Sequence, residues 1–207
     1  MARKAKPRSL KGSAPNGRDD FGRRLRALRQ ERSLRLADVA ALTGLAVSTI
    51  SKVERGLMAL TYDRLMQLAK GLQIDVAALL RAEGKSFGHE VVAVARRDDF
   101  RLQETPTYRY EFLFTDIWNK AMTPMAGTVK AHSPSEFSGF HSHPGQELVH
   151  VISGQLTIHF ENSPPVILDV GESIYFDSGQ GHNYTSTSKD DARILVVCVP
   201  ATDLRHP

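Results

Sequence analysis

The sequence predicts a two-domain α+β protein, with a helical N-terminal domain followed by an all-β C-terminal domain. Between residues 20 and 80, apolar side chains recur at the three- and four-residue steps that bury one face of a helix. Beyond Tyr108 this period disappears, and short β-rich runs separated by turn residues follow. Residues 1–80 hold 16 Lys and Arg against 7 Asp and Glu, a charge of +9, whereas the remainder is acidic. We therefore expect that only the first domain meets a polyanion.

The clearest helical signal lies between Leu36 and Gly56, where two short helices meet at Gly44. The apolar positions of the second helix follow at three-residue steps: Val47, Ile50 and Val53. Between them stand small or cationic residues that are free to face outward: Ser48, Thr49, Ser51 and Lys52. Two helices across a tight glycine turn are typical of a helix-turn-helix, whose second helix reads base edges in the DNA major groove.

This stretch resembles the XRE (phage-repressor-like) helix-turn-helix family, over about residues 21 to 80. The resemblance rests on residue types in matching order: Leu25, Arg26, Leu28, Arg29, Leu34, Ala40, Gly44, Ile50, Ser51, Glu54, Arg55 and Gly56. It implies a five-helix bundle that binds double-stranded DNA, with an ion pair between Arg29 and Glu54. The alternative is a helical bundle that does not bind DNA, as in some protein-binding relatives.

The expected DNA-binding residues lie at the starts of the two helices and along the second: Arg35, Leu36, Val47, Ser48, Thr49, Ser51, Lys52 and Arg55. The family usually places a serine or threonine cap before each helix, but here those positions are Arg35 and Ala46. A lost cap costs about 1 kcal/mol, and we expect Arg35 to offset part of it through a phosphate contact. Val47 suits a thymine methyl, and Lys52 can reach guanine or phosphate.

Composition places the chain among ordinary globular proteins, with 41% apolar and 24% charged residues in a length of 207. The single cysteine, Cys198, rules out an internal disulfide, and its apolar setting indicates a buried structural thiol. No apolar run follows the basic N-terminus, and none approaches the roughly 20 residues that cross a bilayer. We therefore expect a soluble, cytoplasmic protein.

The helical domain is expected to span residues 19–80, after a flexible basic arm at 1–18 that either contacts DNA or only adds solubility. Asp19 or Asp20 can cap the first helix. After the helix-turn-helix, Thr61 and Asp63 can begin a fourth helix, and Asp75 a short fifth one. These last two helices are interpreted as scaffold.

Residues 81–107 are expected to form a linker in which only 91–94 could make a strand, followed by an all-β domain at 108–202. Its expected strands are bounded by turn residues: Tyr108–Phe114, Gly127–Ala131, Glu147–Ile152, Gln155–Phe160, Ser173–Phe176, Asn183–Thr187 and Arg193–Val199. Many short strands with close turns are typical of a sandwich or barrel.

The β-domain contains a candidate metal site formed by His141, His143, Glu147 and His182. His141 and His143 share a face of an extended chain because they are two residues apart. Pro144 and Gly145 can then turn the chain and re-aim Glu147. Three imidazoles and a carboxylate suit a divalent transition metal such as zinc, iron, nickel or manganese. The alternative is a metal-free pocket in which these side chains bind an organic effector directly. The other histidines, His89, His132, His150 and His159, lack a partner at ligand spacing or have the wrong strand parity.

These residues resemble the cupin family over about residues 108 to 200, which implies a double-stranded β-helix barrel with the four side chains converging inside. The first cupin motif is complete from His141 to Gly154. The second runs from Gly171 to His182. Three positions depart from the family pattern: Ser135 replaces a glycine, Asp177 a proline and Ser186 an asparagine.

A helix-turn-helix followed by a cupin domain resembles the XRE-cupin transcriptional regulators. We therefore expect a sequence-specific DNA-binding regulator, a repressor, whose cupin domain binds a small-molecule effector, a metal ion or both. We expect a homodimer that reads a palindromic operator, because one reader helix covers only a few base pairs. The alternative is a metal-dependent cupin enzyme of the dioxygenase or isomerase type, although no general acid or base stands beside the ligands. A third possibility is an antitoxin-like DNA-binding protein with a toxin partner, but such a protein would not be expected to carry a whole sensor barrel.

Overall fold

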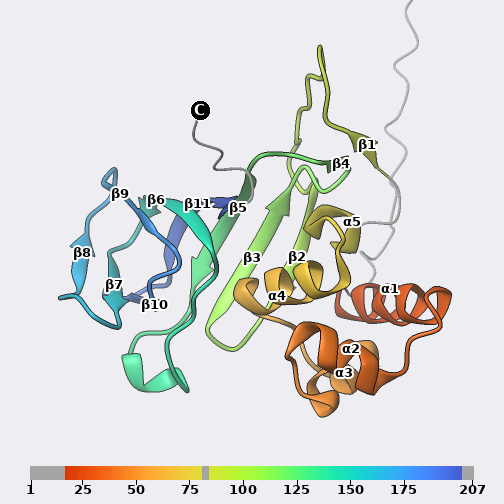
Figure 1. Ribbon diagram of the computed structural model, residues 1–207. Coiled ribbons are helices and arrows are strands. Elements are labelled where there is room, and N and C mark those ends of the chain that lie inside the picture. The colour runs from red at the N-terminus through yellow and green to blue at the C-terminus, as the bar shows by residue number, and fades with distance from the viewer. Residues whose placement is uncertain (1–16, 81–83, 202–207) are drawn as a thin grey trace, which may run out of the picture.

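A computed structural model describes residues 17–80 and 84–201, and it places a helical domain beside a β-rich domain (Figure 1). The helical part contains four helices of eight or more residues and then a single turn: α1 (Gly17–Glu31), α2 (Leu36–Thr43), α3 (Val47–Glu54), α4 (Tyr62–Leu72) and α5 (Val76–Leu80). The helix α1 begins two residues earlier than the expected caps, Asp19 and Asp20. The rest of the expected basic arm, residues 1–16, lies outside the described residues.

The helices pack around one apolar core, as their spacing predicts. Buried positions recur at steps of three and four residues in α4, where they are Leu65, Leu68, Ala69 and Leu72. In α3, Ile50 and Val53 are each 1% exposed. Each fully buried aliphatic side chain of this size contributes about 1.5–3 kcal/mol through removal of apolar surface from water. The core therefore fixes which face of α3 remains free.

The β-rich domain consists of a six-stranded sheet, a three-stranded sheet and a short parallel pair. The large sheet runs in the order β2 (Phe100–Glu104), β3 (Tyr108–Leu113), β5 (Thr123–Val129), β11 (Ala192–Pro200), β6 (Gly145–Ser153) and β9 (Ser173–Asp177). The small sheet runs β10 (His182–Ser186), β7 (Leu156–Phe160) and β8 (Val166–Leu168). The remaining elements are β1 (Lys85–Ser86), which pairs with β4 (Ile117–Trp118), and the 3-10 turn η1 (Pro134–Glu136).

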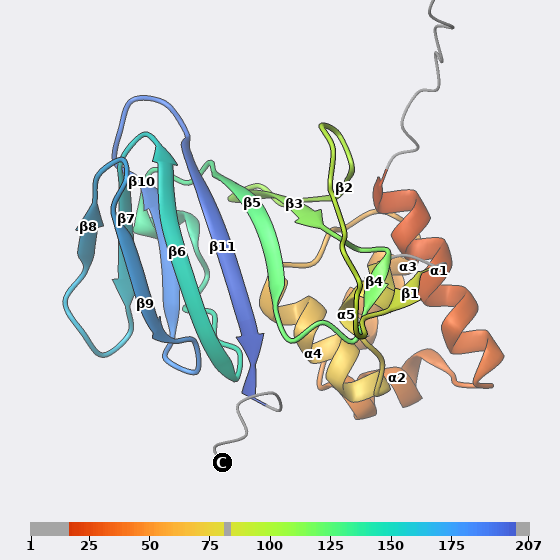
Figure 2. The same ribbon diagram turned by 90° about the horizontal axis from the view of Figure 1, so that it is seen from above.

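The two sheets face each other across a shared interior (Figure 2). Burial alternates residue by residue along β3, β5 and β11, so every second side chain points inward. Tyr108 on the large sheet connects to the small one, because its hydroxyl accepts a hydrogen bond from the Tyr184 amide at 2.8 Å. Phe160 and Phe176 meet edge to face from opposite sheets, with ring centroids 5.2 Å apart.

Part of the expected linker is wrong, since it contributes strands to the β-domain. Residues 100–104 form β2, which pairs antiparallel with β3 at the edge of the large sheet. The run at 91–94, by contrast, contains no strand, and Val92 and Val94 are exposed. The strand β8 was also missed, because its three residues follow the turn at 162–165 too closely to show a period of their own.

The helical domain packs against the β-rich domain (Figure 2): α1 contacts β2, α5 contacts β4, and Tyr62 of α4 stacks on Phe112 of β3. Asp75 caps α5 by accepting from the Ala77 amide at 2.6 Å, and its other oxygen accepts from the Asn119 amide at 2.8 Å. In the described part of the chain, no single helix is long and apolar enough to span a membrane; α2 and α3 reach that threshold only together, across a 116° bend.

Candidate functional site

The face of α3 that carries the expected DNA-reading residues, here called the reader face, points outward because Ile50 and Val53 on the opposite face are buried. Gly44 adopts the left-handed conformation, φ 71°, that ends α2, and a residue with a side chain would be strained there. Of the expected DNA-binding residues, five are exposed: Arg35, Val47, Ser48, Lys52 and Arg55. The other three are half-buried: Leu36, Thr49 and Ser51. The exposed residues therefore offer a methyl-bearing side chain, a hydroxyl and three cations.

Both unusual caps are present as expected. Ala46 precedes α3 in an extended conformation and offers no side-chain acceptor. Before α2, Asp38 partly compensates, because its Oδ2 accepts from the Arg35 amide at 2.7 Å. The Arg35 guanidinium meets the same carboxylate, with Nη2 3.1 Å from Oδ1. This pair is exposed to solvent, so Arg35 can exchange Asp38 for a phosphate at little cost.

The expected ion pair between Arg29 and Glu54 is confirmed. Arg29 donates twice to the carboxylate, from Nε at 2.6 Å and from Nη2 at 2.9 Å. A third bond runs from Nη1 to the Leu34 carbonyl oxygen at 3.0 Å. The arginine fork thus ties α1 to the end of α3 and to the segment before α2, and so fixes the reader helix.

The β-domain interior gathers three of the four expected metal ligands. His143 Nε2 lies 3.0 Å from Glu147 Oε2, and His182 Nε2 lies 3.7 Å from the same oxygen. Gly145 makes this convergence possible: its φ is 141°, and a Cβ there would lie 2.1 Å from the Val199 carbonyl oxygen. The predicted kink at Pro144 and Gly145 therefore re-aims Glu147, at the start of β6, into the pocket.

Backbone pairing brings in the fourth ligand, His141. Its amide and carbonyl pair with those of His182, at 3.2 and 2.8 Å. The His141 ring lines the same cavity, but its Nδ1 lies 3.4 Å from Asp63 Oδ2, a residue of the helical domain. His182 shows a similar arrangement, with Nδ1 2.8 Å from the Gln180 carbonyl oxygen. In both rings an oxygen engages Nδ1, so Nε2 is the nitrogen that a metal would bind, as in many metal-ligating histidines.

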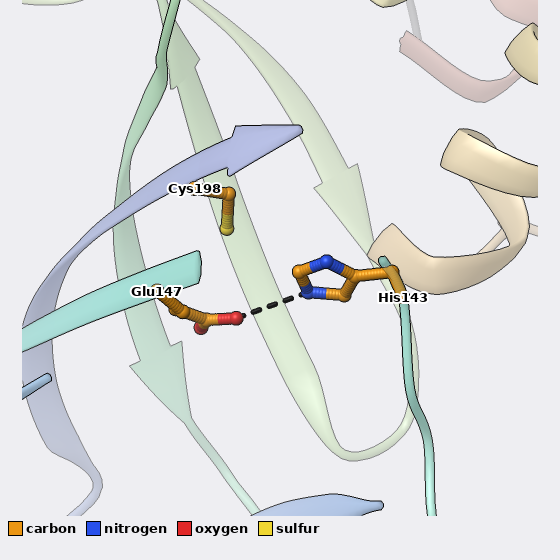
Figure 3. A group of neighbouring side chains, drawn as sticks. All are labelled: His143, Glu147 and Cys198. Carbon is orange, nitrogen blue, oxygen red and sulfur yellow. Dashed lines mark hydrogen bonds and ion pairs between the residues drawn. The ribbon is translucent and has the colours of Figure 1, made fainter. Parts of the chain in front are cut away.

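Cys198 is a pocket residue that was not among the expected ligands. One donor atom from each of His143, Glu147 and Cys198 lies within 4.8 Å of the other two, and all three residues are buried (Figure 3). Strand parity carried the signal, because Cys198 follows Ile194 and Val196 on the inward face of β11. The thiol is buried as expected, but it faces the ligands instead of plain core.

Burial and charge set the protonation of this cluster. Burial raises the pKa of the Cys198 thiol and Glu147 adds to the rise, so the free thiol is protonated. Burial also lowers the pKa of His182, which favours the neutral imidazole that binds metals. For Glu147, burial acts to raise the pKa, but the hydrogen bond from His143 and the neighbouring His182 outweigh it and leave a lowered pKa. Tyr184 also donates to this carboxylate.

The donor set fits a divalent transition metal. Neutral imidazole nitrogens, an ionised carboxylate and a thiol together form a borderline-soft set, suited to zinc, iron or copper more than to magnesium or calcium. Oxygen partners at Nδ1 of His141 and His182 supply the outer support that such ligands need.

The remaining histidines behave as expected from parity and spacing. His150 faces away from the pocket and bonds Ser173, with Nδ1 2.9 Å from Oγ. His159 meets Thr185 Oγ1 at 2.9 Å. His132 pairs with Asp191 at the surface, and His89 is exposed.

The cupin-motif departure at Asp177 also has a local explanation: its Oδ1 accepts from the Gly179 amide at 2.8 Å and makes the turn that proline would otherwise favour.

The comparisons with known proteins match both domains. Residues 25–79 match the helix-turn-helix family model, and residues 131–198 match the cupin domain model. The HTH-type transcriptional regulator PuuR of Escherichia coli (strain K12) is 24% identical over 182 residues, which cover 87% of this chain and 95% of PuuR. PuuR of Shigella flexneri matches to the same extent.

A solved structure shows the same fold over nearly the whole chain. The HTH_3 family transcriptional regulator from Vibrio cholerae has a TM-score of 0.57 and 22% sequence identity, covering 88% of this chain and 96% of that one. This likeness concerns the fold, whereas the two family models confirm the resemblance of each domain that the motifs indicate.

Proposed function

The chain belongs to the helix-turn-helix transcriptional regulators that carry a cupin domain, and we propose that the cupin pocket controls its binding to an operator. The observation that carries this proposal is the pairing of an exposed reader face on α3 with a buried pocket of convergent imidazole, carboxylate and thiol groups. The proposed DNA-binding domain spans residues 19–80. The proposed sensing domain spans residues 108–202, and β2 also belongs to it. Because the proposed target is operator DNA, the proposed location is the cytoplasm.

On the DNA side, we assign the contacts to Arg35, Leu36, Val47, Ser48, Thr49, Ser51, Lys52 and Arg55. Exposed cations supply phosphate attraction, and the hydroxyls and Val47 supply readout of base edges. The reader set is small, so affinity per subunit is modest. We therefore propose a homodimer on a palindromic operator, with half-sites about one turn apart.

One sheet face supports dimerisation. Leu148 and Tyr175 lie opposite each other on β6 and β9, and both are exposed, at 36% and 62%. Ile152, farther along β6, is 50% exposed. Apolar residues on the outer face of a sheet are typical of a surface that a second copy covers. Sedimentation equilibrium of wild type and Tyr175→Lys tests this: the variant should dissociate at higher concentration.

Inside the barrel, we assign a divalent metal to His141, His143, Glu147 and His182, with Cys198 as a further donor. A bound metal supplies a Lewis-acidic point to which an effector attaches. The alternative, direct binding of an organic effector by the same side chains, remains a second outcome. Metal analysis of protein purified from its native host, with mass spectrometry of any co-purified ligand, separates the two.

We further propose that the pocket senses rather than catalyses, which is in line with the relatives being transcriptional regulators. The cupin-enzyme alternative predicts turnover by metal-loaded protein that is abolished in His182→Ala.

DNA binding is tested by fluorescence anisotropy with a fragment from upstream of the protein's own gene. We expect specific binding whose affinity falls steeply with salt. Lys52→Ala and Ser48→Ala should weaken specific binding more than non-specific binding, whereas Lys189→Ala, an exposed cation on the β-domain, should change neither. Equal affinity for random DNA at physiological salt would overturn the proposed function.

A further inference from the structure

The start of α4, in the DNA-binding domain, reaches into the cupin pocket. Three residues of this segment, Thr61, Tyr62 and Asp63, line the same cavity as the ligand histidines and Glu147. Tyr62 is the first residue of α4 and Thr61 its N-cap. The pocket is therefore closed on one side by a segment that belongs to the other domain.

Tyr62 fills this opening with its aromatic ring. Its side chain is buried, and its ring meets that of His143 edge to face at 4.8 Å between centroids. On its other side it stacks on Phe112 of β3 at 6.1 Å. Its hydroxyl is buried without a hydrogen-bond partner of normal geometry among the described residues.

Asp63 fastens the same segment to a metal ligand. Its Oδ2 lies 3.4 Å from His141 Nδ1, with only 16% of the Asp63 side chain exposed. Thr61 donates its hydroxyl to the other carboxylate oxygen. The ring nitrogen that faces Asp63 is not the one left free for a metal. A metal can therefore bind His141 while Asp63 holds it.

The space that remains is too small for an organic effector. The cavity volume is about 30 Å³, roughly the share of one water molecule in the liquid. Pockets for small organic ligands measure about 300–1,000 Å³. A metal ion fits without rearrangement, whereas a metabolite does not. Most of the lining comes from the strands of the two facing sheets, so the segment from the other domain is the part that can leave without unfolding the β-rich domain.

We propose that Tyr62 and Asp63 form a plug, the α4 plug, that an organic effector must expel from the cupin pocket. This inference rests on the proposed function and names its regulation. Effector binding and docking of the DNA-binding domain then exclude each other, whereas metal binding and docking are compatible. The effector's differential affinity for the unplugged state supplies the coupling that regulation needs.

The plug has a direct route to the reader helix. Tyr62 and Asp63 open the helix α4, which packs against α2, and α2 packs against α3. In the docked state the reader face is exposed and its orientation relative to the β-domain is fixed. Undocking frees that orientation, so placing two reader helices on one operator becomes entropically less favourable. Effector entry therefore lowers operator affinity, as expected of an inducible repressor.

The first experiment asks whether Tyr62 closes the pocket. Protein loaded with Co²⁺ is titrated with imidazole, an organic metal ligand, and the visible d–d absorption is followed. Wild type and Tyr62→Phe should bind imidazole weakly, and Tyr62→Ala about tenfold or more tightly, because the open fraction no longer limits binding. Phe87→Ala, which removes an exposed aromatic ring outside the pocket, is the matched control and should behave as wild type. Equal imidazole affinity in wild type and Tyr62→Ala, or no binding by either, overturns the plug.

The second experiment needs no ligand. Mild nitration with tetranitromethane, mapped by mass spectrometry, should spare Tyr62 in folded wild type and modify it in urea-unfolded wild type. In Asp63→Ala, which keeps the tyrosine but removes its fastening, Tyr62 should become reactive, and amide hydrogen exchange should speed up at residues 61–66. Nitration of Tyr62 in folded wild type at the rate found in the urea-unfolded protein would contradict docking.

Operator binding in the same preparations separates the two proposals. Wild type that binds DNA specifically, with no imidazole difference between it and Tyr62→Ala, removes the plug and leaves the regulator standing. Wild type without specific DNA binding removes the proposed function itself. If the plug is right, imidazole lowers the operator affinity of Co²⁺-loaded wild type, and Tyr62→Ala has low operator affinity before imidazole is added.

Discussion

Asp63 Oδ2 lies 3.4 Å from His141 Nδ1, so a residue of the helical domain contacts a candidate metal ligand of the β-rich domain 78 positions farther along the chain. Burial acts to raise the pKa of Asp63, but hydrogen bonds from His141 and Thr61 outweigh it, and the net pKa is lowered. The carboxylate is therefore ionised and able to orient the imidazole. This contact connects the pocket to the reader helix α3, because Asp63 lies on α4, which packs against α2, and α2 packs against α3.

Asp63→Asn should weaken metal binding. Loss of an outer carboxylate that orients a ligand histidine typically reduces metal affinity about 10–100-fold. Isothermal titration with Co²⁺ measures the change. Asp191→Asn is the matched control, because Asp191 pairs with His132 at a similar 3.3 Å but at the surface. Equal Co²⁺ affinity in both variants would show that Asp63 does not support a metal ligand.

Glu147→Gln should abolish tight metal binding, since it removes the charged oxygen shared by His143 and His182. The metal should also stabilise the fold: a ligand at 100 times its Kd adds about 2.7 kcal/mol. Thermal unfolding of the wild type with Co²⁺ and with EDTA measures this difference, which should vanish in Glu147→Gln. His150→Ala should retain it, because His150 faces away from the pocket. A Co²⁺-induced rise in Tm that survives in Glu147→Gln rules out this site.

Glu54→Ala should destabilise the helical domain by roughly 2 kcal/mol, because it leaves the Arg29 guanidinium without its charged partner in a largely buried position. Arg29→Ala should have a similar effect, and the double variant should lose less than the two losses combined. Urea unfolding followed by circular dichroism provides the measurement. Asp38→Ala, which breaks an exposed pair, should change stability far less. Additive losses would mean that the two residues stabilise the domain independently.

Ala46→Ser should stabilise the protein by about 1 kcal/mol, because a serine hydroxyl can cap α3 where alanine cannot. The backbone is already suited to a cap, with φ −63° and ψ 141°. Ala41→Ser, at an exposed interior position of α2, is the control and should be slightly destabilising. Urea midpoints of the two variants should therefore move in opposite directions. Urea midpoints that decrease in both variants would show that α3 does not lack a cap.

The sequence by itself determined the features that depend on local spacing. Helical steps of three and four residues located α2, α3 and α4, and the pairing of Arg29 with Glu54 followed from the matching motif. Strand parity separated His150 from the ligands, and the kink at Gly145 predicted that Glu147 would turn inward. Such features depend on periodicity and turn chemistry, which neighbouring residues dictate.

Only the tertiary structure decided the contacts between segments far apart in the chain. The strand β2 exists because β3 offers it an edge, although its own residues lie in a stretch with weak patterning. Cys198 lies beside His143 and Glu147 because β11 and β6 pair with Cys198 opposite Glu147. Tyr62 is buried against His143 because its domain docks on the β-rich domain. A helix-starting tyrosine has the same local pattern whether it faces solvent or another domain, so periodicity alone does not reveal the plug.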